Sequence, residues 1–213
     1  MEQVQQDELI KKGNELFKSR PSFLLGVANI NQLPTDGLME IAFAGRSNVG
    51  KSSLINAVTG VRGLARASNT PGRTQQLNFF KVSDKCHIVD LPGYGYAAAP
   101  EKMVQAWTRL IHDYLRGRVQ LRRVFLLIDA RHGIKEVDEK IMKMLDAAAV
   151  TYQIILTKAD KISRVAGETM LKQTIEAGQK HVACYPEILL TSSEKNWNID
   201  LVRAEFIKVI EEI

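Results

Sequence analysis

The sequence alternates short apolar runs with longer segments of helical period, which restricts the chain to a few folds. Six apolar runs have the length of strands and are bounded by polar residues or glycine: residues 39–44, 77–82, 86–89, 124–128, 152–156 and 188–190. Helical patterns lie between and after them, over residues 51–58, 103–114, 137–148 and 201–213. Such alternation predicts an α/β fold of three layers, with helices on both faces of a mostly parallel six-stranded sheet. Ligands of these sheets bind at the carboxyl ends of the strands.

The rest of the chain indicates one domain. With 213 residues and 45% hydrophobic content, the sequence can bury a single core. Residues 1–21 are polar, and we expect them to form an extension, flexible or helical, ahead of a domain over residues 22–213. Neither a signal peptide nor a run of roughly 20 apolar residues is found, and Cys86 and Cys184 have no partners at metal-ligand spacing. We expect a cytoplasmic monomer without a membrane span, a zinc site or a disulfide.

The loop after the first apolar run matches the phosphate-loop pattern G-x-x-x-x-G-K-S. It reads Gly45-Arg46-Ser47-Asn48-Val49-Gly50-Lys51-Ser52. The glycines let backbone N–H groups turn toward phosphate oxygens, and the following helix directs the positive end of its dipole at them. By this pattern, Lys51 binds the β- and γ-phosphates and the Ser52 hydroxyl binds Mg²⁺.

Two further motifs follow strand ends and select the nucleotide. The first is Asp90-Leu91-Pro92-Gly93, in which Asp90 can hold Mg²⁺ through water and the Gly93 amide can reach a γ-phosphate. The second is Thr157-Lys158-Ala159-Asp160, in which the carboxylate can accept from N1–H and the exocyclic amine of guanine. Adenine offers neither donor at that edge, so Asp160 favours a GTPase over a P-loop kinase or ATPase.

Residues around the base motif complete the expected pocket for guanine. The Lys158 stem can lie over the base, and Thr191-Ser192-Ser193 can contact it from the other side through backbone amides. Thr157 stands where Asn is more usual, and we expect this to weaken the local tie to the phosphate loop.

The connection between the first helix and the second apolar run is a candidate switch. It reads Asn69-Thr70-Pro71-Gly72-Arg73-Thr74-Gln75-Gln76. A threonine there can give its hydroxyl to Mg²⁺ only when a γ-phosphate is bound, which would couple the order of the loop to the nucleotide. Both Thr70 and Thr74 are candidates on this argument. Contacts with GTP are expected from Gly72, Arg73, Thr74, Gln75 and Gln76.

With these five elements in order, the chain resembles the EngB (YihA/YsxC) family of bacterial GTPases, in the translation-factor-like branch of P-loop GTPases. The resemblance covers about residues 22–212 and includes Phe43-Ala44-Gly45-Arg46-Ser47-Asn48, residues 70–75, Asp90-Leu91-Pro92-Gly93-Tyr94-Gly95-Tyr96-Ala97 and Asp129-Ala130-Arg131-His132. It implies that Thr74 rather than Thr70 is the Mg²⁺ ligand. It also implies one antiparallel edge strand, residues 77–82, and Asn48 as a candidate potassium ligand, although Asn48 could equally bond within the loop.

No catalytic side chain stands out. Lys51, Thr74 and Gly93 are the candidates for stabilising the transferred phosphoryl group, whereas His112 and His132 lack the spacing for acid–base roles. Many small GTPases orient the attacking water with a Gln directly after D-x-x-G, but this chain has Tyr94 there. We expect slow intrinsic GTP hydrolysis that a partner or a cation accelerates.

The resemblance implies a partner as well: the large ribosomal subunit or its precursor, with its rRNA and ribosomal proteins, and a requirement for normal cell division. The net charge of +5 is compatible with an RNA partner, and equally with an ordinary solvated surface. The same two interpretations apply to Arg116, Arg118, Arg122 and Arg123. A guanine-nucleotide-dependent protein of the division and septation machinery is the alternative function.

Overall fold

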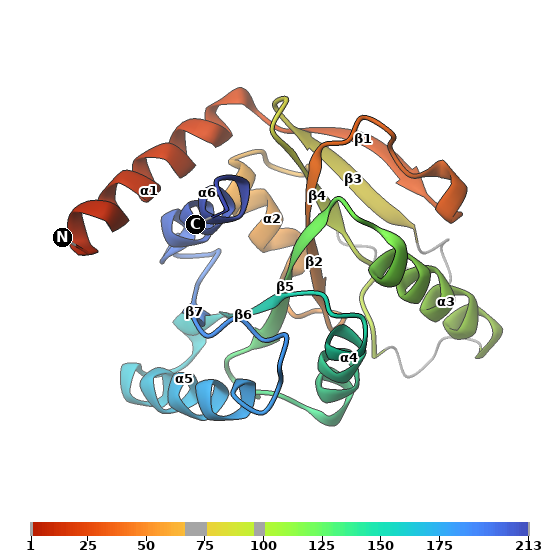
Figure 1. Cartoon of the computed structure of the whole chain (residues 1–213). Helices are drawn as coiled ribbons and strands as arrows, with labels where there is room; N and C mark the ends of the chain where they lie inside the picture. The colour runs from red at the N-terminus through yellow and green to blue at the C-terminus, as the bar shows by residue number, and fades with distance from the viewer. Residues whose placement is uncertain (1, 67–75, 96–100, 213) are drawn as a thin grey trace.

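A seven-stranded sheet forms the centre of the computed structural model, which describes residues 2–66, 76–95 and 101–212 (Figure 1). The strands are β1 (Ser22–Val27), β2 (Met39–Gly45), β3 (Leu77–Val82), β4 (Cys86–Asp90), β5 (Leu121–Asp129), β6 (Tyr152–Thr157) and β7 (Leu189–Leu190). Their order is β1-β3-β4-β2-β5-β6-β7, and β3 is antiparallel to both of its neighbours. The other pairs are parallel, so the sheet is mostly parallel as predicted.

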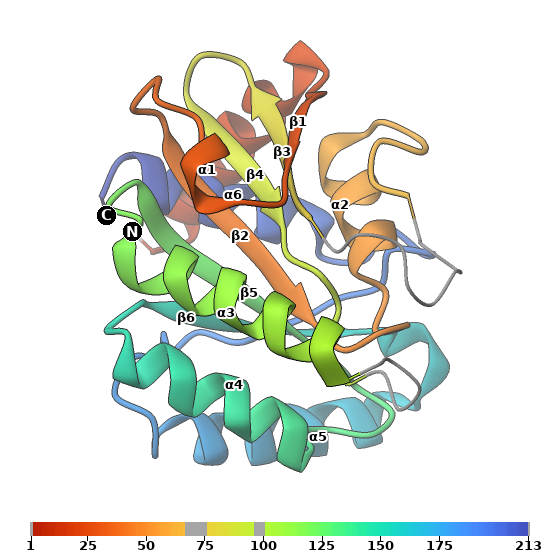
Figure 2. The ribbon, with the colours of Figure 1, turned by 90° about the vertical axis from the view of Figure 1, so that its right-hand side faces the viewer.

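Helices cover both faces of the sheet and confirm the three-layer fold. They are α1 (Glu2–Leu16), α2 (Lys51–Thr59), α3 (Glu101–Gly117), α4 (Glu136–Ala147), α5 (Arg164–Gly178) and α6 (Ile199–Ile210), with 3-10 helices at Phe17–Ser19, Ile30–Gln32 and Ala159–Lys161. One core joins the sheet to α2 and α6, and the other joins it to α3, α4 and α5. Figure 2 looks onto α3 and α4, with α6 behind the sheet. Within the described ranges, no helix is long and apolar enough to cross a bilayer.

The expectation of six strands with residues 77–82 at the edge was wrong. β1 pairs with β3 and takes the edge position. Phe23 and Leu24 in β1 are 56% and 40% exposed, because an edge strand on the rim of the sheet buries little of its surface. Such a strand lacks the continuous buried apolar run by which the others are recognised.

The helix α5 was also missed, although Met170, Leu171 and Ile175 on it pack against the core. The buried residues on it are Gly167, Thr174 and Gly178. Its start does carry a signal, since the Ser163 hydroxyl accepts a hydrogen bond from the Ala166 amide at 3.2 Å.

Residues 2–16 form the helix α1 ahead of the first strand. α1 lies along α6, and the contact depends on Gly13, where a Cβ would sit 2.6 Å from the carbonyl carbon of Arg203. Leu9 and Phe17 are buried there. The division of the chain at residue 21 stays an expectation.

Two of the four clustered arginines are not available as a basic surface. Arg118 donates to Glu40 through Nε at 2.8 Å, and Arg123 donates to Glu205 at 2.9 Å, and both carboxylates are buried. These are internal ion pairs, which need their partners because an isolated buried charge is strongly unfavourable. Only Arg116 and Arg122 of the four are exposed.

Parallel pairing brings the ends of the strands to one edge of the sheet. The register places Phe43 of β2 beside Asp90 of β4, and Asp129 of β5 beside Thr157 of β6. Leu156 of β6 pairs with Leu190 of β7. The motifs that follow these strands therefore meet at a single edge.

Candidate nucleotide-binding site

The phosphate loop has the backbone shape that its glycines permit. Gly50 has a φ of 104° and precedes α2 directly, and Asn48 is also left-handed with a φ of 62°. At Gly45 a Cβ would lie 2.8 Å from the Val49 side chain, so only glycine fits. The Val49 amide donates to the Arg46 carbonyl at 3.1 Å and closes the loop. The N-terminus of α2, with its unpaired N–H groups, therefore opens onto a small loop suited to an anion.

The charged groups assigned to phosphate and metal lie side by side. The Lys51 ammonium contacts the Asp90 carboxylate directly, and only 12% and 8% of these side chains are exposed. Asp90 ends β4, and the Leu91 amide after it donates to the Phe43 carbonyl at 3.0 Å. Ser52 is half-buried in the first turn of α2. A hydroxyl and a carboxylate are the oxygen ligands that Mg²⁺ prefers, so these residues fit that ion.

The D-x-x-G segment continues along the phosphate loop. The Tyr94 amide donates to the Gly45 carbonyl at 3.3 Å, and the Ser47 amide donates to the Tyr94 carbonyl at 3.0 Å. Gly93 lies against the loop, since a Cβ there would be 3.3 Å from the Ser47 hydroxyl oxygen. Leu91 is buried and Pro92 is half-buried. The structure thus brings this segment and the phosphate loop together as the sequence predicted.

The base end is held by hydrogen bonds between the segment after β6 and the segment after β7. The Ser192 hydroxyl donates to Asp160 Oδ1 at 2.5 Å, and the Ala159 amide donates to the Thr191 carbonyl at 3.0 Å. The Lys161 ammonium lies 3.0 Å from Asp160 Oδ2. The hydrogen bond from Ser192, followed by the contact with Lys161, lowers the pKa of Asp160. The carboxylate is therefore an ionised acceptor, as recognition of guanine requires.

Sequence reasoning assigned Ser192 a contact through its backbone and missed this role for its hydroxyl. The hydrogen bond joins two residues 32 positions apart, which no local pattern reveals. Ser193, next to it, is half-buried.

Thr157, which stands where Asn is more usual, does reach the phosphate loop. Its hydroxyl donates to the Val49 carbonyl at 2.7 Å, so the shorter side chain still ties β6 to the phosphate loop. Thr157 is buried, which makes this hydrogen bond a firm link between the two ends of the site.

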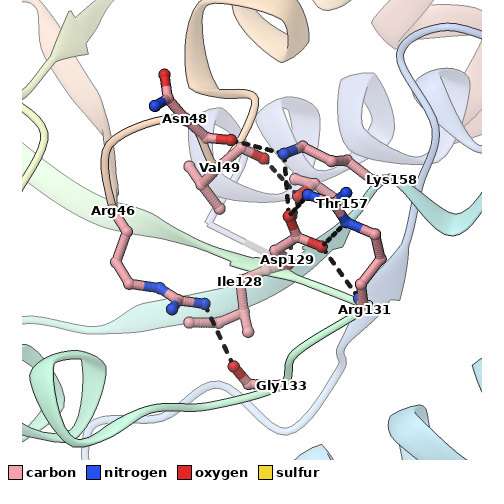
Figure 3. Close-up of polar contacts among 9 residues, drawn as sticks. All are labelled: Arg46, Asn48, Val49, Ile128, Asp129, Arg131, Gly133, Thr157 and Lys158. Carbon is pink, nitrogen blue, oxygen red and sulfur yellow. Dashed lines mark hydrogen bonds and ion pairs between the residues drawn. The ribbon is translucent and has the colours of Figure 1, made fainter. Parts of the chain in front are cut away.

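A second link runs through Asp129, to which the sequence had given no role of its own. Figure 3 shows the Lys158 ammonium between the Asn48 carbonyl, at 2.6 Å, and Asp129 Oδ2, at 2.9 Å. Arg131 donates to both oxygens of the same carboxylate, at 2.9 and 2.7 Å. Burial alone would raise the pKa of Asp129, but Arg131 and Lys158 hold it well below its usual range. The available signal was a carboxylate directly after the apolar run of residues 124–128.

The remaining candidates are the residues of the expected switch loop, Gln76 and the Asn48 side chain. Thr70, Gly72, Arg73, Thr74 and Gln75 lie outside the described residues. The Gln76 side chain lies over Gly26 of β1, where its Oε1 fills the space of a Cβ. Asn48 takes part through its backbone carbonyl.

Comparisons with known proteins agree with this geometry. The model of a family described as "50S ribosome-binding GTPase" matches residues 40–158. A "Probable GTP-binding protein EngB" of Roseobacter denitrificans is 55% identical over 195 residues, which is 92% of this chain and 90% of the relative. A protein of the same name from Brucella melitensis is 52% identical over 217 residues, covering 97% of this chain and 90% of the relative.

Solved structures show the fold. A crystal structure of "a probable GTP-binding protein engB" matches with a TM-score of 0.66 and 22% identity, over 82% of this chain and 100% of that one. Era in complex with MgGDPNP and a segment of 16S ribosomal RNA matches with a TM-score of 0.61 and 22% identity, over 81% of this chain and 57% of that one. With its phosphate loop and these relatives, the chain belongs to the EngB family of GTP-binding P-loop GTPases.

Proposed function

We propose that this protein is a guanine-nucleotide switch whose GTP-bound form docks on the large ribosomal subunit or its precursor in the cytoplasm. The description of the matching family, "50S ribosome-binding GTPase", supports the partner. The net charge of +5 favours contact with rRNA phosphates. A defect in subunit assembly would limit growth, which would make the protein necessary for normal cell division.

The observation that carries the proposal is the position of Asp160. This ionised carboxylate is held by Ser192 beside a phosphate loop to which Thr157 and Lys158 are bound. A carboxylate in this place accepts from two donors of guanine, and the linked phosphate loop binds the other end of the same nucleotide. Base and phosphates are therefore recognised by one connected site.

Mg²⁺ fits the oxygen ligands of the phosphate end. We propose that the Ser52 hydroxyl binds it directly, Asp90 through water, and Thr74 when a γ-phosphate is present. The ion would neutralise charge on the β- and γ-phosphates. Lys51 would leave Asp90 for the phosphates, and the Gly93 amide would donate to the γ-phosphate.

Slow intrinsic hydrolysis follows from Tyr94. Its phenol is 5% exposed and donates to a carboxylate inside the protein, so it cannot orient a water molecule beside the phosphate. Acceleration by the ribosomal partner, or by potassium bound near Asn48, remains part of the proposal. Equal rates of GTP hydrolysis in potassium and sodium buffers would contradict a potassium site.

Sedimentation with ribosomal particles tests the proposed function. The full chain should migrate with the large subunit in the presence of a non-hydrolysable GTP analogue and leave it with GDP. Asp160→Asn is the matched control, because it should respond to xanthine nucleotides in place of guanine nucleotides. Absence from particles in both states would contradict the ribosomal role and favour the division machinery as partner.

A further inference from the structure

A buried carboxylate outside the nucleotide motifs binds the residue that follows D-x-x-G. The Tyr94 hydroxyl donates to Asp138 Oδ1 at 2.8 Å, and Asp138, in the first turn of α4, is fully buried. Burial, followed by the charge of Asp138, raises the pKa of the Tyr94 phenol far above its ordinary value. Tyr94 is therefore a permanent hydrogen-bond donor to Asp138.

The other oxygen of the same carboxylate binds two more groups. The Lys135 amide donates to Asp138 Oδ2 at 2.8 Å, and Arg46 Nε of the phosphate loop lies 3.3 Å from it. Arg46 also reaches the Gly133 carbonyl at 3.5 Å, and Figure 3 shows its side chain extended toward Gly133 and away from Asn48. One carboxylate thus joins the phosphate loop, the D-x-x-G segment and the start of α4.

The two residues that converge on Asp138 are also neighbours in the backbone. Arg46 and Tyr94 form a parallel bridge, fixed by the hydrogen bond from the Ser47 amide to the Tyr94 carbonyl at 3.0 Å. Gly93 comes directly before Tyr94 and lies against Ser47. The position of Tyr94 therefore determines where the Gly93 amide lies relative to the phosphate loop.

We propose that Asp138 is a positioning residue for GTP: by binding Tyr94 and Arg46 it holds the Gly93 amide in place for the third phosphate, and it so sets the ratio of the affinities for GTP and GDP. This inference rests on the proposed function, in which Gly93 donates to the γ-phosphate. If the carboxylate releases Tyr94, binding of a γ-phosphate must first order the segment around Gly93, and that ordering opposes binding. GDP has no γ-phosphate, so its affinity should not fall for this reason.

A purely structural role would give a different result. Loss of the Tyr94–Asp138 hydrogen bond would then lower stability and leave the ratio of the affinities for GTP and GDP unchanged. The ratio therefore distinguishes the two roles, since a general loss of folded protein lowers both affinities by the same factor.

The decisive variant is Tyr94→Phe, which removes one hydroxyl and keeps the ring. Tyr114→Phe is the matched control, because Tyr114 is fully buried and donates to the buried Glu40 carboxylate at 2.8 Å at the other end of the sheet. Dissociation constants of the full chain for GDP and for a non-hydrolysable GTP analogue, both with Mg²⁺, are measured by calorimetry. We expect Tyr94→Phe to weaken binding of the GTP analogue about 5- to 10-fold while GDP binding stays within about twofold.

Tyr114→Phe should leave both constants unchanged, whatever its melting temperature. An unchanged ratio in Tyr94→Phe, or equal weakening for both nucleotides, would overturn the proposal. The affinities are measured without ribosomes. An unchanged ratio of affinities in Tyr94→Phe would therefore not affect the docking result of the sedimentation experiment. Likewise, a protein that does not dock on ribosomal particles could still show the changed ratio.

Asp138→Asn provides a second test of the same link. The substitution should shift the ratio in the same direction as Tyr94→Phe. The double variant should be no worse than the more affected single variant, because both substitutions act on the same hydrogen bond between Tyr94 and Asp138. Additive effects would contradict the shared role, and Tyr94→Phe still decides the question if Asp138→Asn does not fold.

Discussion

The base end and the phosphate end of the site differ in what their charged side chains bind. At the base end, Asp160 already accepts from Ser192, and Lys158 is already held between Asn48 and Asp129. At the phosphate end, Lys51 and Asp90 bind each other. The charged groups at the base end are thus oriented by neighbours within that end, including Lys161 at 3.0 Å from Asp160, whereas at the phosphate end the two groups assigned to phosphate and metal bind each other. This difference predicts that the base end determines affinity for guanine nucleotides as a class, while the phosphate end responds to the state of the nucleotide.

The largest effect should come from changing the base end itself. Asp160→Asn replaces an ionised acceptor with an amide whose N–H groups face the guanine donors. Loss of two charge-assisted hydrogen bonds should weaken GDP and GTP alike by at least about 100-fold. Titration with xanthine nucleotides should show restored binding. Undiminished GTP affinity would show that the carboxylate does not bind the base.

At the phosphate end, Lys51→Ala should weaken both nucleotides roughly 100-fold, since it removes a charged contact with the phosphates and leaves Asp90 to repel them. The matched control is Lys12→Ala, which removes an ion pair with Glu211 on the surface, 3.0 Å in length. Fluorescence titration of labelled GDP checks both. Unchanged affinity in Lys51→Ala would contradict the assignment of the phosphate loop.

Asp129→Asn tests whether the base end acts as a connected unit. Weaker contacts to Lys158 and Arg131 should raise the dissociation rates of GDP and GTP by about the same factor, on the order of 10-fold. The control is Asp146→Asn. This carboxylate lies away from the site, and its Oδ2 is 2.6 Å from His181 Nδ1. If the dissociation rate rose for GTP alone, the base end would not act on GDP and GTP alike, which would contradict the contrast between the two ends.

A smaller effect is expected from Thr157→Val, which keeps the shape of the side chain and removes its hydrogen bond to Val49. Nucleotide affinity should fall about 5-fold for GDP and GTP alike. Thr174→Val removes a comparable hydroxyl, which donates to the Met170 carbonyl at 2.7 Å in α5, and should leave affinity unchanged. Equal losses in the two variants would show that only stability is affected.

The smallest effect concerns pH. The pKa of Asp129 is lower in the folded protein than in the unfolded chain, where it is about 3.9. Its ion pairs therefore stabilise the fold at pH values above about 3.9. The free energy of unfolding of the wild type should exceed that of Asp129→Asn at neutral pH. The difference should narrow as the pH falls below about 4, and urea denaturation at several pH values measures it. If the difference in free energy of unfolding widened as the pH fell, the ion pairs of Asp129 would not be what stabilises the wild type over Asp129→Asn.

Much of the fold was predictable because buried parallel strands leave continuous apolar runs, as in β5 and β6. β1 and α5 were missed because the first is an edge strand with Phe23 and Leu24 exposed, and the second buries Gly167 and Gly178. Glycines interrupt the apolar residues of both elements, so their pattern is weaker than that of β5 and β6.

In the site, too, features set by a short stretch of sequence were predictable, and contacts between residues far apart in the sequence were not. The backbone of the phosphate loop and the place of Asp160 follow from motifs, which are short stretches of sequence. The hydrogen bonds from Ser192 to Asp160 and from Tyr94 to Asp138 join residues 32 and 44 positions apart. Their side chains meet only because the ends of parallel strands share one edge, so sequence spacing alone could not identify them.

Hydrogen exchange of the full chain tests the central contrast most directly, with no nucleotide, with GDP and with a non-hydrolysable GTP analogue. Amides of residues 157–160 and 190–193 should be protected without nucleotide and gain little on binding. Amides of residues 46–52 and 91–95 should gain protection with GDP, and those of 91–95 should gain more with the GTP analogue. Fast exchange at the base end without nucleotide, or equal protection of residues 91–95 in both bound states, would contradict a preformed base end beside a phosphate end that responds to the nucleotide.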